Sequence, residues 1–115
     1  MLGLYDEIYR CGLLRHLPVR CEQAAAHAAC SSYAATRALG ACIVTSGPGI
    51  TNAITGIATA QADSVPVLAI SGQVPLASMG RGSFQECDAV GLASPCTKGC
   101  YSLRRVLDIR RAAWE

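Results

Sequence analysis

One charged side chain stands out for the chemistry that its neighbours would allow. Five of the seven residues that follow Glu22 are alanine. A carboxyl group among such apolar neighbours loses hydration, which favours its protonated form and suits it to proton transfer. The alternative is a carboxylate exposed at the start of a helix and stabilised by the helix dipole. Composition alone favours this second interpretation.

A glycine-rich segment, residues 45–49 with the sequence Thr-Ser-Gly-Pro-Gly, is the second candidate for a site. Glycines at the start of a helix let an anion or a cofactor approach the backbone N–H groups. The segment is not a phosphate-binding P-loop, because no Gly-Lys-Ser/Thr follows it. A plain turn between a strand and a helix is the simpler alternative, and the spacing alone favours it.

The cysteines lack the spacing of a metal site. There are seven of them, none in a Cys-x-x-Cys pair, and the two histidines lie far in sequence from the closest pair, Cys96 and Cys100. We therefore expect no metal site and interpret the cysteines as reduced, small apolar residues. A small redox or metal module built on these thiols is the alternative.

The apolar pattern predicts the elements that must position these residues. We expect helices over residues 4–14, 22–39, 51–63, 84–92 and 106–115, buried strands over 41–45 and 65–70, and a short last strand over 97–103. Residues 16–20 are expected to form an edge strand or a loop, and residues 75–83 a loop. Helices that alternate with continuously apolar strands predict an α/β fold, a parallel sheet flanked by helices.

The expected fold singles out three turns. Ligands of parallel α/β sheets bind beyond the carboxyl ends of the strands. The segments expected there are residues 20–23, 45–49 and 71–75.

Composition argues against several classes of protein. The 115 residues correspond to one domain or part of one, and 51% of them are hydrophobic, which argues against disorder. The net charge is +2, and the nine arginines and one lysine are scattered, so we expect no nucleic-acid partner. No run approaches the ~18 apolar residues of a membrane span. Residues 1–20 also lack the apolar core of a secretory signal, so we expect no membrane partner.

Ordered motifs across about two-thirds of the chain resemble one enzyme family. Residues 20–29 resemble its R-H-E-Q-A-A-A-H-A-A, and residues 45–52 its T-S-G-P-G-A-T-N. Further matches follow in register at residues 56–60, 63–66, 71–75 and 84–86. Together they resemble the N-terminal, pyrimidine-binding domain of acetolactate synthase (acetohydroxyacid synthase), a thiamin-diphosphate enzyme. The resemblance implies that residues 1–115 are an incomplete domain of this kind.

The resemblance implies a reaction and a catalytic residue. Glu22 matches the glutamate that hydrogen-bonds the aminopyrimidine of thiamin diphosphate and promotes its activation. The activated cofactor attacks pyruvate, carbon dioxide leaves, and the remaining two-carbon unit adds to a second 2-oxo acid. The product is a 2-acetohydroxy acid of branched-chain amino acid biosynthesis. The cofactor performs the difficult chemistry, and the protein orients it and manages its protons.

Other site residues are implied one position at a time. Gln85 matches a glutamine near the reaction centre, and Phe84 matches an aromatic residue on the substrate side. Pro48 and Asn52 belong to the turn that packs near the pyrimidine.

Three more positions match contacts of other ligands in the family. Ser64 matches a position that approaches FAD. Pro75 and Lys98 match positions where herbicidal inhibitors bind.

The resemblance also implies what this sequence does not contain. The family holds the diphosphate through Mg²⁺ in a C-terminal domain with a G-D-G…N motif, and a middle domain makes most FAD contacts; neither is found here. We expect this chain to supply half a site, completed in a homodimer or by a full-length catalytic subunit. The alternative is a non-catalytic remnant that binds a full-length subunit. The family occurs in bacterial cytoplasm, plastids and mitochondria, and we expect one of these locations.

Two departures from the family pattern lie near Glu22. Cys21 replaces the histidine of R-H-E-Q, and it is smaller. Residues 30–34, Cys-Ser-Ser-Tyr-Ala, stand where the family has D-G-Y-A-R. Because this segment lies within the expected alanine-rich helix, we expect altered packing there rather than lost chemistry.

Overall fold

Two short parallel strands form the centre of the computed structural model, which describes residues 1–114. Strand β1 (Gly40–Val44) pairs with β2 (Val67–Ser71), with Gly40 opposite Val67 and Val44 opposite Ser71. The crossover between them is helix α3 (Pro48–Ala62), which packs beside α2 (Glu22–Thr36) on one face of the sheet. This arrangement confirms the predicted α/β fold with a parallel sheet and flanking helices.

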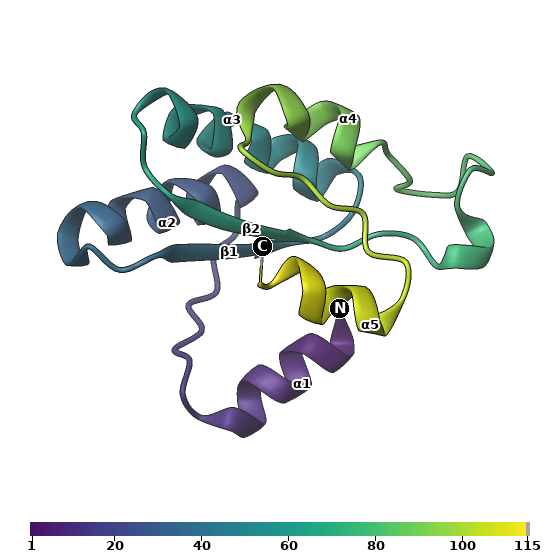
Figure 1. Ribbon diagram of the computed structural model, residues 1–115, viewed down its shortest axis with the longest axis horizontal. Coiled ribbons are helices and arrows are strands. Elements are labelled where there is room, and N and C mark those ends of the chain that lie inside the picture. The colour runs from purple at the N-terminus through teal and green to yellow at the C-terminus, as the bar shows by residue number, and fades with distance from the viewer. Residues whose placement is uncertain (115) are drawn as a thin grey trace.

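The remaining elements surround this unit (Figure 1). Helix α4 (Ala89–Ala93) packs on α3, while α1 (Leu2–Cys11) and α5 (Val106–Ala112) lie on the other side of the strands. Two short 3-10 helices span Leu76–Ser78 and Ser94–Cys96. In the part of the chain that the structure describes, no helix is long and apolar enough to cross a membrane.

The two long helices differ from the prediction at one end each. Helix α2 stops at Thr36 rather than at residue 39, because Arg37 adopts the left-handed conformation (φ 60°) that ends a helix. Helix α3 begins at Pro48 rather than at residue 51. A proline suits the first helical turn, because its fixed φ is helical and its missing N–H would have no helical partner there.

The predictions were less accurate after β2. The helix expected over residues 84–92 begins only at Ala89, because Gln85 has a φ of 61° and Asp88 caps the new helix by accepting from Gly91 N at 2.9 Å. The strand expected over residues 97–103 was wrong, since these residues form no strand and pair with neither β1 nor β2. The side chain of Thr97 instead donates to the carbonyl of Ala93 at 3.0 Å.

Two loops and the last helix agree with the sequence prediction in part. Residues 16–20 form a loop rather than an edge strand, and the expected loop at 75–83 contains one short 3-10 turn. The last helix starts at Val106 as expected and ends at Ala112, while Glu115 lies outside the described residues.

The core is built from small side chains where α2 and α3 meet. Ala26 and Ala53 are fully buried, and Ala29 is nearly so. A Cβ added to Gly56 would lie 2.5 Å from the Cβ of Ala26, closer than two carbon atoms can approach. A Cβ on Gly40 would overlap the backbone carbonyl of Ala29. The absence of a side chain at both glycines lets α2 pack closely on α3 and on β1.

The segment that departs from the family pattern continues helix α2 without a break. Cys30 faces α3, and its thiol donates to the carbonyl oxygen of Gly56 at 3.7 Å. The cysteine side chain therefore takes part in the contact between the two helices.

The two faces of the sheet are covered to different extents. Cys42 and Val44 are buried beneath the helices, whereas Leu68 on the other face is 47% exposed. Helices α1 and α5, which lie on that side, contribute no buried residue. Parallel sheets are ordinarily covered on both faces, so the stability of this unit depends chiefly on the face packed against α2 and α3.

We predict that Gly56→Val destabilises the protein by about 1–3 kcal/mol, because the new side chain must push α2 away from α3. Denaturant unfolding of the purified protein measures the change. Ala58→Val is the matched control, since Ala58 is exposed on the same helix and should cost only the lower helix propensity of valine. Equal losses in the two variants would contradict close packing at Gly56.

All seven cysteines are free, but they differ in environment. Cys42 is buried, and burial raises the pKa of its thiol, with a smaller contribution from the neighbouring Cys30. Cys11 and Cys21 are exposed. Burial therefore reduces both the fraction of Cys42 that is in the reactive thiolate form and the access of a reagent to it.

We predict that iodoacetamide alkylates Cys11 and Cys21 well before Cys42 at neutral pH. Peptide mass spectrometry after timed labelling of the native protein measures each rate, and labelling in denaturant provides the control in which the rates converge. Alkylation of Cys42 as fast as that of Cys11 in the native protein would show that β1 is not buried.

Candidate functional site

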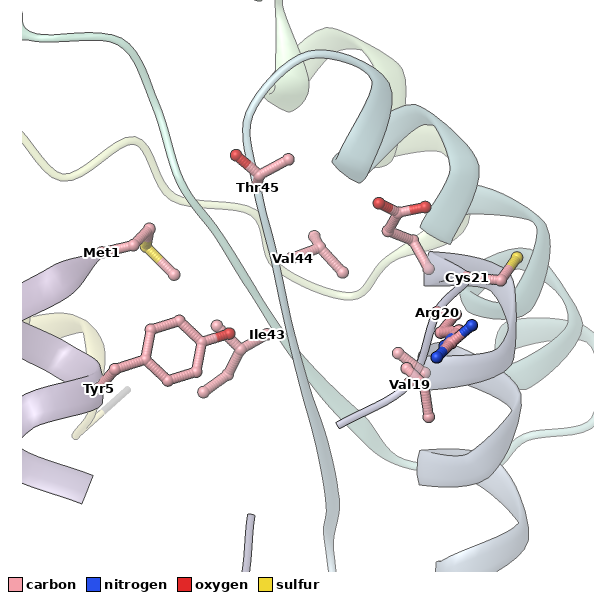
Figure 2. A pocket seen from close by; sticks show the side chains of 10 residues that line it. Met1, Tyr5, Val19, Arg20, Cys21, Ile43, Val44 and Thr45 are labelled. Atoms are coloured by element: carbon pink, nitrogen blue, oxygen red, sulfur yellow. The ribbon is translucent and has the colours of Figure 1, made fainter. Parts of the chain in front are cut away.

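An open cavity lies where the loop before α2 meets the end of β1. Its volume is about 340 Å³, at the lower end of the ~300–1,000 Å³ of ligand pockets. Figure 2 shows Val44 and Thr45 between two residues on one side, Tyr5 of α1 and the preceding Met1, and Val19 on the other side. The carboxyl end of a parallel strand, where ligands bind in such folds, therefore forms part of its wall.

Glu22 contributes the carboxylate of this cavity. It is the first residue of α2, is half-buried, and lines the cavity together with Cys21 and Ala25. The side chain of Asn52 on α3 donates from Nδ2 to Oε2 of Glu22 at 3.2 Å. Among the described residues, Asn52 is the one hydrogen-bond partner of this carboxylate. The other oxygen, Oε1, is therefore available to a ligand.

The packing of the helices explains why Glu22 and Asn52 meet. Ala26 and Gly56, which are in contact, lie four residues beyond Glu22 and Asn52 respectively. Residues four apart share one face of a helix. The glycine that allows the helices to approach thus also sets the distance between the two polar side chains one turn away.

The turns that follow the two strands are joined to each other. The N–H of Gly72 donates to the carbonyl of Val44 at 2.9 Å. The hydroxyl of Ser71 donates to the carbonyl of Gly72 at 2.9 Å and lies 3.4 Å from the carbonyl oxygen of Thr45. The turn after β1 continues into α3, where the N–H of Thr51 donates to the carbonyl of Gly47 at 3.2 Å. The turn at residues 20–23 lines the cavity together with Val44 and Thr45, so the three turns predicted as candidate sites lie at one end of the sheet.

A later segment, residues 85–87, crosses these strand ends. Gln85 has a φ of 61°, and a Cβ on Gly47 would lie 2.7 Å from the carbonyl oxygen of Gln85, so the two backbones are in close contact. The carbonyl of Cys87 accepts from Nε2 of Gln73 at 3.1 Å. Gln85 is thereby held at the same end of the sheet as Glu22.

The other sequence-predicted residues are more dispersed. Pro48 occupies the first turn of α3, four residues before Asn52, and is exposed. Phe84 is 90% exposed, next to Gln85. Pro75 is exposed where the short 3-10 helix begins after β2, and Lys98 is exposed beyond Ser94–Cys96.

Ser64 lies away from this group. It follows the last turn of α3 with a φ of 54°, whereas Asn52 belongs to the first turns. Because a 15-residue helix is about 22 Å long, Ser64 is at the opposite end of α3 from the Glu22–Asn52 pair.

Only some of the cavity residues carry a signal in the sequence. Thr45, Arg20 and Cys21 fall within the turns that it singled out, but Met1, Tyr5 and Val19 do not. Their position depends on how α1 and the following loop lie against β1, and nothing in their type or spacing signals it.

The site offers one oriented carboxylate in a cavity that is lined by apolar side chains and by the polar Tyr5, Arg20 and Thr45. Such a group can accept a hydrogen bond from a ligand or hold a proton for it. No group of three or more His, Cys, Asp or Glu side chains among residues 1–114 is arranged to hold a metal ion.

Comparison with known proteins identifies the family. The family described as thiamine pyrophosphate enzyme, N-terminal TPP binding domain, matches residues 1–92. An acetolactate synthase of Arthrospira platensis is 49% identical over 117 residues, which cover 99% of this chain and 20% of the relative. A probable acetolactate synthase large subunit of Methanocaldococcus jannaschii is 49% identical over 118 residues, covering 100% and 20%.

A third relative shows similar agreement. The acetolactate synthase isozyme 3 large subunit of Escherichia coli K12 is 45% identical over 118 residues, which cover 99% of this chain and 21% of the relative. The chain thus spans about a fifth of the length of the relatives it matches. Since the match covers most of the chain, this protein belongs to the thiamine pyrophosphate enzymes, through their N-terminal TPP-binding domain.

Proposed function

We propose that this chain forms the pyrimidine-binding half of a thiamin-diphosphate-dependent acetolactate synthase. The reaction would condense pyruvate with a second 2-oxo acid, as in the synthesis of branched-chain amino acids. The observation that carries the proposal is the Glu22 carboxylate, which lines a cavity at the carboxyl end of β1 and is oriented by Asn52. The names of the relatives, all acetolactate synthases or their large subunits, support the choice of reaction.

The residues of the cavity fit an aminopyrimidine ring. Val19, Ala25, Ile43 and Val44 supply apolar walls suited to a flat aromatic ring. Glu22 places a hydrogen-bonding oxygen on the same cavity, where a ring nitrogen could meet it. Because the described residues offer no cluster of metal ligands, we propose that they hold the pyrimidine half and that Mg²⁺ and the diphosphate bind elsewhere in the assembly.

The role of each residue follows from these contacts. Thiamin diphosphate, when bound, supplies the carbon nucleophile for the decarboxylation and condensation of 2-oxo acids. Glu22 would hold a proton at Oε1 toward the ligand. Asn52 Nδ2 occupies Oε2 and so directs the other oxygen into the cavity. Ile43 and Val44 would exclude water from the side of the sheet, which strengthens the hydrogen bond that Glu22 makes.

The remaining residues are assigned by position. We propose that Gln85, held against Gly47 beside the strand ends, and the exposed Phe84 face the 2-oxo acid. Pro75 and Lys98 would border the inhibitor-accessible side. Ser64, at the far end of α3, would contact FAD in a region separate from the pyrimidine. A second copy of the chain or a full-length catalytic subunit would complete the site.

We predict that Glu22→Gln lowers acetolactate formation by about 100-fold or more, because an amide cannot take up and release the proton. The variant should be made in the protein as it occurs, with any partner retained, and both acetolactate and thiamin diphosphate binding should be measured. Glu7→Gln, an exposed carboxylate on α1, is the matched control. Near-normal acetolactate formation by Glu22→Gln would remove Glu22 from the mechanism.

The same assay separates the two candidate functions. A protein that binds a full-length subunit but changes neither its acetolactate formation nor its thiamin diphosphate binding would be a non-catalytic remnant. If Glu22→Gln instead loses both acetolactate formation and thiamin diphosphate binding, the result would support a working half-site.

We predict that Asn52→Leu lowers turnover by about ten-fold, because Glu22 loses the hydrogen bond that orients it. The measurement is kcat together with the dissociation constant of thiamin diphosphate. Thr59→Ala is the control, since Thr59 bonds only within α3, to the carbonyl of Thr55. Equal activity in Asn52→Leu and Thr59→Ala would show that the orientation of Glu22 does not depend on Asn52.

A further inference from the structure

A second carboxylate, that of Glu86, holds together a loop beside the site. Oε1 of Glu86 accepts a hydrogen bond from the backbone N–H of Gly80, and Oε2 accepts one from the N–H of Ser83 at 3.0 Å. The N–H of Glu86 in turn donates to the carbonyl of Ser83 at 2.9 Å. Both oxygens of one side chain therefore bind the two ends of the short segment 80–83.

The tip of this loop has little packing support from the described residues. Gly80 and Gly82 have positive φ angles of 75° and 66°, and a Cβ added at either would meet no atom within 4 Å. Arg81 between them is exposed. One further bond, from the hydroxyl of Ser83 to the carbonyl of Ser78 at 2.7 Å, closes the base of the loop. The conformation of the tip thus depends on Glu86 rather than on packing.

Glu86 itself lies between two residues that are anchored to the strand ends. On one side the backbone of Gln85 contacts Gly47. On the other side the carbonyl of Cys87 accepts from Gln73, in the turn after β2. The carboxylate therefore connects the free loop to the segment that crosses both strands. Figure 1 shows this green part of the chain extending beyond the end of β2.

We propose that Glu86 is a positioning residue, whose carboxylate closes the loop at residues 79–84 and thereby fixes Gln85 and Phe84 at the strand-end site. This inference rests on the proposed function insofar as Gln85 and Phe84 act in that site. Glu86 touches no part of the cavity, so it acts through its neighbour Gln85, whose left-handed backbone needs support from both sides.

The charge state of Glu86 agrees with this role. The backbone N–H groups of Gly80 and Ser83 lower the pKa of its carboxyl most; desolvation opposes them, and the N–H groups of Arg81 and Gly82 make smaller contributions in the same downward direction. No charged side chain contributes, although Arg81 on the loop and Asp88 before α4 are near in sequence. Because the pKa is lowered, the closed loop is stabilised above the ordinary carboxyl pKa. That stabilisation is lost as the pH falls through the lowered pKa.

We expect Glu86→Gln to raise hydrogen exchange of residues 79–84 and tryptic cleavage after Arg81 by about ten-fold each, because one charge-assisted bond is lost. Both are measured by mass spectrometry on the protein purified with any partner and without thiamin diphosphate. Asp88→Asn is the matched control, since Asp88 is a carboxylate in the same segment that caps α4 and does not contact the loop. Its loop should exchange like that of the unmodified protein.

The pH profile distinguishes closure by the carboxylate from a general effect on folding. Protection of residues 79–84, corrected for intrinsic exchange, should stay constant above the ordinary carboxyl pKa in the unmodified protein and fall as the pH drops below it, whereas it should not change with pH in Glu86→Gln. Glu86→Asp, one methylene shorter, should lose one of the two bonds and give intermediate protection. Unchanged protection in Glu86→Gln, or equal loss throughout the chain, would overturn the closure.

Turnover then tests the positioning of Gln85. Glu86→Gln should lower kcat about ten-fold with little change in the dissociation constant of thiamin diphosphate, and it should add nothing to Gln85→Ala. Additive losses in the double variant, or an open loop with normal kcat, would overturn the positioning role and leave the proposed function standing. A fully active Glu22→Gln variant would overturn the proposed function. The closure of the loop by Glu86 would then be judged by hydrogen exchange alone.

Discussion

The structure depends on one close contact between two helices. At the point where α2 meets α3, Ala26 is fully buried and Gly56 has no side chain, so the helix backbones approach more closely than larger residues would allow. One turn before this contact, the same geometry brings Asn52 to within 3.2 Å of Glu22. The residues at this point of contact are small and closely packed, so a single added methyl group disturbs it. Packing and the candidate chemistry therefore share one constraint.

A second level of organisation lies at the strand ends. The turn after β2 is hydrogen-bonded to the end of β1, and residues 85–87 cross both turns through Gln73 and Gly47. These bonds use mainly backbone groups, so they hold the site together without occupying its side chains. The half-buried Glu22 and the exposed Phe84 remain available to ligands at this end of the sheet.

The two faces of the sheet contribute unequally to stability, because one of them is only partly covered. Leu68 is 47% exposed there, and neither α1 nor α5 buries a residue. The ordered contacts concentrate on the other face, around α2, α3 and the turn that follows β1. Glu22 and Asn52 therefore lie on the better packed side of the described chain, which helps to hold their orientation.

The sequence by itself determined the order of elements around the site and the residues to examine there. Continuous apolar runs identified both strands of the sheet, the glycine-rich segment located the turn into α3, and the motifs around Glu22 and Gln85 indicated the family. These features are local, because period, turn chemistry and motif spacing act over a few residues. Only the tertiary structure decided that residues 97–103 form no strand, since strand formation needs a paired neighbour. It likewise decided that Asn52 bonds Glu22, that Ser64 lies apart and that Glu86 closes a loop, because these depend on distances between elements remote in sequence.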